Sequence, residues 1–291
     1  MLGVDSRLVD PDIADKYKGY KGESDRGVPI ASWDWAVDAD VLVSHSGYDN
    51  TPGAVTNQPV ILCCHGRPYN SLMIESESGG KKPIYSFMRK KNYDERIRAV
   101  VTFWSEHIKF FEVMFPDKPV KLVQAPVDLM EWCDGPARYK FNGKGGDINV
   151  VCTDTWRQDG GPWMPLNVFA LWARDNPSAK LHLYAVPKRA GGYAALIERV
   201  RSDGNLGEVR GYVQKGLKEI YRSADLMLTG NNIDTRTVRE AMACGCPVMK
   251  INEWPYQTVF PVSRDAAREI AEEKFNPTVS AMQFQMILDS L

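Results

Sequence analysis

The stretch REAMACGCPV places a carboxylate, Glu240, one turn inside a short predicted helix that follows the apolar strand LMLTG. Gly230, Asn231 and Asn232 lie between the strand and the helix. Backbone amides at a helix N-terminus form a natural binding site for phosphate. A carboxylate one turn further on can accept hydrogen bonds from ribose hydroxyls. The spacing therefore suggests a site for a nucleotide.

Glu240 also has a purely structural interpretation. The residues Thr237–Glu240 (TVRE) fit a capping box, in which the first and last side chains of the motif each bond a backbone amide at the start of a helix. Asp234 or Thr235 can cap this helix, and Gly245 can supply the left-handed residue that ends it. Spacing alone leaves both interpretations open.

Strand and helix patterns alternate along most of the chain, which predicts an α/β fold with two Rossmann-like domains, parallel sheets and a cleft between them. A Gly-, Lys- and Asn-rich segment near residue 145 predicts the hinge. The expected domains are residues 1–143, residues 147–275 and a C-terminal helix, 276–291, that packs back towards the first domain. Ligands of such sheets bind beyond the carboxyl ends of the strands.

The beginning of the chain gives a separate expectation. VDSRLV (residues 4–9) reads as the first strand and should pair directly with the strand at 40–45 or at 59–64. Residues 10–35 are polar and without apolar periodicity, so we expect a long loop.

Composition narrows the class of protein. The net charge of −1 gives no sign of a general nucleic-acid-binding surface. The six cysteines show neither a disulfide framework nor the spacing of a metal site. No apolar run is long enough for a membrane span, and no secretory signal begins the chain. We expect a cytoplasmic protein that binds no metal.

The order of segments GYV, LKEIYRSADLML and EAMACGCPV resembles the C-terminal half of the GT-B glycosyltransferases, in particular the retaining enzymes of glycosyltransferase family four. ADVLVSHSG, PVILCCHG, VVTFWSEH and KLVQAPVDL resemble strands of the family's N-terminal half. The resemblance covers residues 39–250 and the closing helix. The family's usual first strand and Gly-rich loop do not precede VDSRLV.

The resemblance implies roles for particular residues. Glu240 would bind the ribose of the donor, and Asn232 stands eight residues earlier, where the family has a glutamate that contacts the donor sugar. Arg157 lies in the loop where the family neutralises the leaving diphosphate, although the usual lysine is absent, and Arg236 or Arg239 can supply that charge. His65 corresponds to the histidine that faces the cleft. The predicted catalytic residues are His65, Arg157 and Asn232, and the predicted donor-binding residues are Gly230, Asn231, Asp234, Arg239, Glu240 and Val213.

Asp38 and Asp40 form a DxD triplet, the metal signature of a different glycosyltransferase fold. The triplet precedes a predicted strand instead of following one, so we assign no metal to it. His45 lies at the end of that strand and is a weaker candidate than His65, whereas His107 and His182 are expected to be structural.

The predicted function is transfer of a sugar from a UDP- or GDP-linked donor to an acceptor hydroxyl, with retention of configuration and without a metal or other cofactor. The sequence leaves the acceptor open among lipids, polysaccharides, small molecules, proteins and modified DNA. Two alternatives remain at this point. One is a degenerate GT-B protein that binds a nucleotide sugar or a partner without turnover, and the other is a nucleotide-sugar epimerase.

Overall fold

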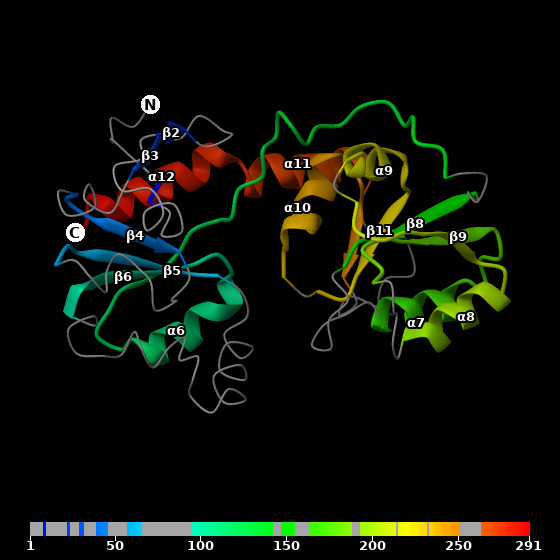
Figure 1. The fold of residues 1–291 in the computed structure, drawn as a ribbon, viewed down its shortest axis with the longest axis horizontal. Helices are drawn as coiled ribbons and strands as arrows, with labels where there is room; N and C mark the ends of the chain where they lie inside the picture. The colour runs from blue at the N-terminus through cyan, green and yellow to red at the C-terminus, as the bar shows by residue number, and fades with distance from the viewer. Residues whose placement is uncertain are drawn as a thin grey trace. The chain divides into compact units, whose positions relative to one another are not determined.

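A computed structural model of the 291-residue chain shows two compact units. One comprises Met1–Gln124 with Ala281–Leu291, and the other comprises Ala125–Ser280. Each contains its own parallel sheet (Figure 1). The structure describes residues 8–9, 22–23, 29–31, 39–45, 57–65, 95–141, 147–154, 163–187, 193–213, 215–231, 233–250 and 263–291.

The main sheet of the first unit has four parallel strands in the order β4-β5-β6-β7. β5 lies in its interior and all five of its residues are buried. A strand covered on both faces must be apolar throughout, which explains the run VILCC. The strands are β4 (Leu42–His45), β5 (Val60–Cys64), β6 (Ile97–Thr102) and β7 (Val120–Leu122).

One face of this sheet is covered by the helix that follows β6. A 3₁₀ turn, η2 (Ser105–His107), leads into α6 (Ile108–Met114). Phe111 of α6 is fully buried and packs in one cluster with Leu62 and Cys64 of β5. Alternate residues of a strand face opposite sides of the sheet, so these two side chains share a face.

The opposite face is covered by the end of the chain. The last helix, α12 (Pro277–Leu288), contributes Ile287 to a cluster that contains Ile61 and Cys63 of β5. The side-chain oxygen of Gln283 accepts a hydrogen bond of 2.8 Å from the backbone amide of Gln124. The C-terminal segment therefore completes the core of the first unit.

The predicted pairing of the first strand is wrong. β1 (Leu8–Val9) pairs in parallel with β3 (Pro29–Ala31), which pairs on its other side with the antiparallel β2 (Gly22–Glu23). β5 has no edge for β1, because β4 and β6 occupy both of its sides. The expected loop at 10–35 thus contains two short strands, which are too short to show a periodicity in sequence.

The sheet of the second unit has five parallel strands in the order β10-β9-β8-β11-β12. The first of them in the chain, β8, is central, and the chain changes direction beside it, as in a Rossmann-like sheet. The strands are β8 (Ile148–Cys152), β9 (Ala179–Leu183), β10 (Leu206–Val209), β11 (Leu226–Thr229) and β12 (Val248–Lys250).

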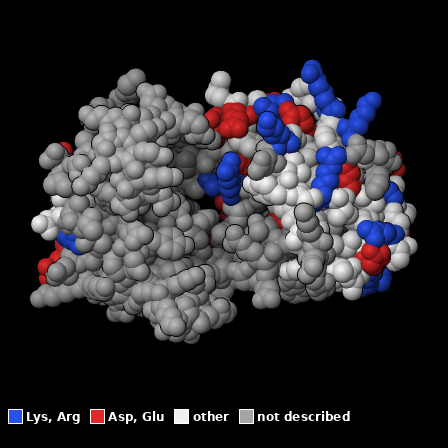
Figure 2. Space-filling view, in the orientation of Figure 1, with Lys and Arg blue, Asp and Glu red and all other residues white. Residues whose placement is uncertain are grey.

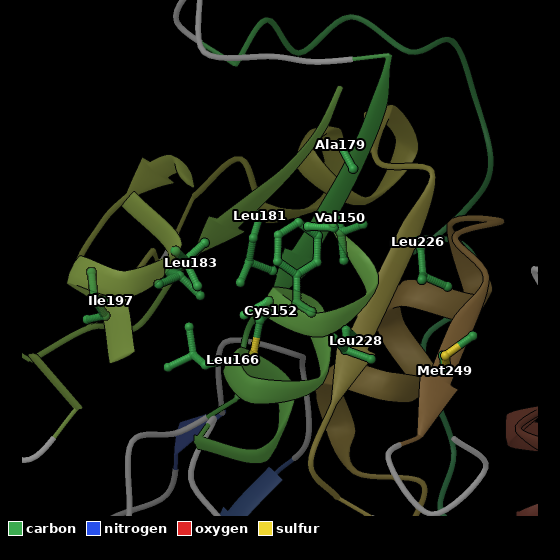
Figure 3. Close-up of a cluster of buried hydrophobic side chains, with 14 residues drawn as sticks. Val150, Cys152, Leu166, Ala179, Leu181, Leu183, Ile197, Leu226, Leu228 and Met249 are labelled. Atoms are coloured by element: carbon green, nitrogen blue, oxygen red, sulfur yellow. The ribbon is translucent and has the colours of Figure 1, made fainter. Parts of the chain in front are cut away.

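Helices cover both faces of this sheet (Figure 1). α7 (Trp163–Trp172) and α8 (Ala194–Ser202) pack on one face, where buried side chains from β8, β9, β11 and β12 and from both helices form the cluster shown in Figure 3. α9 (Leu217–Ser223) and α10 (Arg236–Ala243) pack on the other face. α11 (Arg264–Lys274) contributes Ala271 to a smaller cluster with Ala243 of α10.

The two units divide between Gln124 and Ala125, about twenty residues before the glycine-rich segment that composition suggested. The reason is that residues 125–141 run along the second unit. Arg222 of α9 donates hydrogen bonds to the carbonyl oxygens of Cys133 and Asp134, and Phe141 is buried in the core beneath α9. Residues 142–146 lie outside the described residues.

His182 of β9 has the structural role that we expected. Its Nδ1 accepts a hydrogen bond from the backbone amide of Glu208, so its Nε2 carries the proton and donates to Asn149 at 3.1 Å. Burial lowers its pKa to about 4, and the charge of Lys180 acts in the same direction. The ring stacks on Phe141 and stays neutral at physiological pH.

The backbone of β10 lies so close to this ring that residue 207 must be a glycine. A Cβ atom at Gly207 would lie 2.4 Å from Cε1 of His182. Replacing Gly207 by alanine should therefore lower the stability of the second unit by about 1–3 kcal/mol, because the buried ring has to shift. Thermal unfolding of the full chain would measure this as a lower melting temperature.

Gly211→Ala is the matched control, since a Cβ there would make only an ordinary contact of 3.8 Å with the carbonyl oxygen of Val186. Equal melting temperatures for the two variants would contradict the proposed close packing at His182.

Candidate functional site

The carboxyl ends of three neighbouring strands in the second unit bring polar side chains together. Asp154 follows β8, Gly230 and Asn231 follow β11, and Lys250 is the last residue of β12. Because the strands are parallel and adjacent in the order β8-β11-β12, these ends meet at one edge of the sheet. α10 begins beside the same edge, a few residues after β11.

Asp154 fixes the shape of this edge. Its carboxylate accepts hydrogen bonds from the hydroxyl of Thr229 and the backbone amide of Gly230, both at 2.6 Å, and from the side-chain amide of Asn231 at 3.0 Å. Asp154 is only 2% exposed. Hydrogen bonds to an ionised acceptor are shorter and stronger than neutral ones, so this carboxylate holds the turn after β11 firmly.

These bonds change our expectation for the turn. The amide of Gly230 donates to Asp154, and the amide of Asn231 donates to the hydroxyl of Thr229 at 3.1 Å. Both amides are engaged within the protein, whereas the sequence suggested that they were free to bind phosphate. Sequence reasoning missed Asp154, although an acidic residue directly after a buried strand in INVVCTD is a detectable signal.

α10 starts one residue after Thr235, which has the extended backbone of an N-cap but makes no capping bond with its side chain. Glu240 is the fifth residue of the helix, so it cannot close a capping box with Thr237 as the cap. The capping interpretation of Glu240 is therefore wrong. The expected helix end is confirmed: Gly245 has a φ of 72°, and Cys246 donates its amide to the carbonyl of Ala241, as in a Schellman motif.

Glu240 is buried one turn inside α10 and is hydrogen-bonded to an arginine of the same helix. The residue is 3% exposed, and its Oε1 accepts a hydrogen bond of 2.6 Å from Nε of Arg236, one turn earlier. The side chain of Arg236 is 75% exposed. Burial raises the pKa of Glu240, while the bond from Arg236 and the charge of Arg239 oppose that shift. The result is a buried carboxyl group that Arg236 holds in one orientation.

Arg239 of α10 is half-buried and bonds the backbone of the second unit. Its guanidinium donates to the carbonyl oxygen of Pro126 at 2.8 Å and to that of Thr235 at 3.4 Å. Burial lowers its pKa, and the nearby carboxylates Glu240 and Asp234 oppose the shift. Arg239 thus joins α10 to the chain at residue 126.

Asp234 lies just before the N-cap of α10 and pairs with Lys250. Its carboxylate is 2.8 Å from the ammonium of Lys250, and the two side chains are 36% and 20% exposed. The pair links the start of the helix to the end of β12.

The remaining predicted residues lie elsewhere or outside the description. His65 follows β5 in the first unit, is exposed, and stacks on Phe103 with ring centroids 4.5 Å apart. Val213 follows β10 and packs against the core beneath α9. Arg157 and Asn232 lie outside the described residues. The roles of His65, Val213, Arg157 and Asn232 stay predictions.

Within the described ranges, no group of three or more His, Cys, Asp or Glu residues is arranged to hold a metal ion. In Figure 2 the described part of the surface carries Lys and Arg side chains next to Asp and Glu side chains. No helix among the described residues combines the length and apolar character that a membrane span needs.

No family model matches the sequence, and no curated protein matches it. Solved structures do. HepE of Anabaena in complex with UDP superposes with a TM-score of 0.64 at 14% identity, over 89% of this chain and 81% of that chain. Sucrose-phosphate synthase of Thermosynechococcus elongatus gives a TM-score of 0.63 at 14% identity, over 95% of this chain and 86% of that chain. A glycosyltransferase of Rickettsia africae superposes with a TM-score of 0.58 at 9% identity, over 88% of this chain and 79% of that chain.

The chain has the GT-B fold. The similarity extends over both units, and each parallel sheet is one Rossmann-like half of the GT-B architecture. At this level of identity the match establishes the fold and leaves the chemistry to the residues of the site.

Asp154→Ala tests how firmly the edge of the sheet is held. The change leaves the amide of Gly230 and the hydroxyl of Thr229 without their acceptor, which should cost on the order of 2–4 kcal/mol. Hydrogen exchange measured by mass spectrometry on a peptide containing Gly230 should speed up at least about tenfold, since tenfold corresponds to roughly 1.4 kcal/mol.

Asp203→Ala is the control, because Asp203 is an exposed residue after α8, away from this edge. Its effect on stability should stay within about 0.5 kcal/mol. Unchanged exchange at Gly230 in the Asp154 variant would show that the carboxylate does not order the turn.

Proposed function

We propose that the protein is a glycosyltransferase that transfers a sugar from a nucleoside-diphosphate donor to an acceptor hydroxyl, with retention of configuration and without a metal. The observation that carries the proposal is the buried carboxyl of Glu240, fixed by Arg236 at the carboxyl edge of a Rossmann-like sheet. Ligands of such sheets bind at this edge. Structures of HepE, which shares the fold, contain UDP and UDP-glucose.

Glu240 suits recognition of a ribose. A ribose presents two neighbouring hydroxyl groups, and a carboxylate has two oxygens that can accept hydrogen bonds from them. Arg236 already holds Oε1 in one orientation, so little side-chain freedom is lost when a ligand binds. The exposed guanidinium of Arg236 also places a positive charge beside this carboxyl group, where it can attract an anionic donor.

The proposed reaction breaks the bond between C1 of the sugar and the diphosphate oxygen, and forms a bond between C1 and the acceptor oxygen. Negative charge grows on the leaving diphosphate, which takes up the proton that the acceptor hydroxyl loses. Positive side chains that face the diphosphate stabilise this charge most strongly in the transition state. Arg157 is the residue that we propose for this task from the sequence, and His65 and Asn232 complete the proposed catalytic set.

Glu240→Gln tests the assigned role of the carboxyl group. Glutamine keeps the size and can still accept the bond from Arg236, but it loses the charge that strengthens hydrogen bonds to ribose hydroxyls. Such bonds are worth about 1.5–3 kcal/mol, so nucleotide affinity should fall roughly 10- to 100-fold while the melting temperature of the free protein changes little. Calorimetric titration with UDP and GDP, followed by UDP-glucose, would measure the affinity.

Glu272→Gln is a matched control. Glu272 of α11 accepts a hydrogen bond of 2.6 Å from Arg268 at the same i,i+4 spacing, and its side chain is 52% exposed. This variant should bind nucleotides like the wild type. Equal affinities for both variants would show that Glu240 does not bind the nucleotide. Binding of a donor without any turnover would identify a nucleotide-sugar-binding protein in place of an enzyme.

Donor hydrolysis or sugar transfer should continue in EDTA, because the proposed site neutralises the diphosphate with side chains. The assay compares initial rates with EDTA, with added magnesium and with added manganese. Activity that disappears in EDTA and returns with a divalent cation would contradict the metal-free mechanism and direct attention to Asp38 and Asp40.

A further inference from the structure

We propose that Lys250 binds the diphosphate of the donor and that Asp234 holds the lysine in position until the donor arrives. This inference rests on the proposed function and adds a residue to the proposed diphosphate site. The two side chains already form an ion pair of 2.8 Å at the edge of the sheet where the nucleotide is proposed to bind.

The register of the sheet directs Lys250 towards this site. Lys250 is the residue of β12 that lies opposite Thr229 of β11. Met249 packs in the core on the α7 and α8 face, whereas Val248 packs on the α9 and α10 face. Neighbouring residues of a strand point to opposite faces, so Lys250 shares the face of Val248 and lies beside the start of α10.

Other groups at this edge are already committed within the protein. The amides of Gly230 and Asn231 donate to Asp154 and Thr229. Arg239 donates to two backbone carbonyl oxygens, and these bonds join α10 to residue 126. A diphosphate at this edge therefore needs positive charge from another side chain, in addition to the Arg157 proposed above.

Lys250 meets that requirement. An ion pair between partly exposed side chains contributes little to stability, so breaking the bond between Lys250 and Asp234 costs little. A diphosphate carries more negative charge than one carboxylate and competes effectively for the ammonium. A lysine side chain is a compact positive charge on a flexible stem, which allows it to turn from Asp234 to a phosphate oxygen nearby.

The proposed role of Asp234 predicts that its loss has the opposite effect on diphosphate affinity to the loss of Lys250. In the free protein the carboxylate positions the ammonium, and in the complex it lies close to the negatively charged phosphates. Removing its charge should therefore strengthen the binding of a nucleoside diphosphate. If the pair only stabilised the fold, removing the charge of either Lys250 or Asp234 would leave binding weaker or unchanged.

The experiment is calorimetric titration of the full chain with UDP, GDP, uridine and guanosine. Lys250→Met should reduce affinity for the preferred nucleoside diphosphate at least about tenfold and leave the affinity for its nucleoside unchanged. Lys250→Arg, which keeps the charge, should retain most of the affinity. Asp234→Asn should raise affinity for the diphosphate several-fold and also leave the nucleoside unaffected.

Lys180→Met is the matched control for loss of one lysine. Lys180 is near the amino end of β9, at the opposite edge of the sheet, where its ammonium donates to the carbonyl oxygen of Gly204. This variant should bind all four compounds like the wild type. The melting temperature of each variant shows whether a lost affinity reflects unfolding.

The outcomes separate the two proposals. A wild-type protein that binds none of the four compounds overturns the proposed function, and the role of Lys250 with it. A wild-type protein that binds UDP or GDP, together with an unchanged affinity in Lys250→Met, overturns the role of Lys250 alone. Equal losses for nucleoside and diphosphate in Lys250→Met, or weaker diphosphate binding in Asp234→Asn, would show that the pair is structural.

Discussion

The candidate site depends on one buried carboxylate. Asp154 ties the end of β8 to the turn after β11 through the hydroxyl of Thr229, the amide of Gly230 and the side chain of Asn231. A buried carboxylate is stable only when its oxygens are hydrogen-bonded, and here three donors meet that need. This turn precedes α10, the helix that carries Glu240.

α10 connects that turn to the rest of the second unit. Val238 and Ala241 anchor its apolar side in the core, while Arg239 bonds the chain at residue 126. The side chains of Glu240 and Arg236 lie one turn apart along the helix. These contacts hold the helix and its carboxyl group in a fixed position, which suits recognition of a flexible donor.

Local sequence patterns predicted the strands and helices of the fold, but they did not predict which short strands pair or where α10 starts. Buried parallel strands such as VILCC are apolar throughout because both faces are covered, and that property is visible in sequence. The pairing of β1 with β3 was not predicted, because strands of two or three residues show no periodicity. The capping interpretation of Glu240 failed for a related reason: the helix starts at Arg236, and the capping motif alone did not locate that start.

A resemblance to a known family predicted the GT-B architecture, whereas the sequence pattern by itself determined the alternation of strands and helices and the glycine that ends α10. These features depend on neighbours within a few residues, where periodicity and backbone preference act. Only the tertiary structure decided that Asp154 meets Gly230, 76 residues away, and that Lys250 pairs with Asp234. Such contacts form because parallel strands bring their carboxyl ends to one edge, and which side chains meet there depends on strand order and register, which local sequence does not encode.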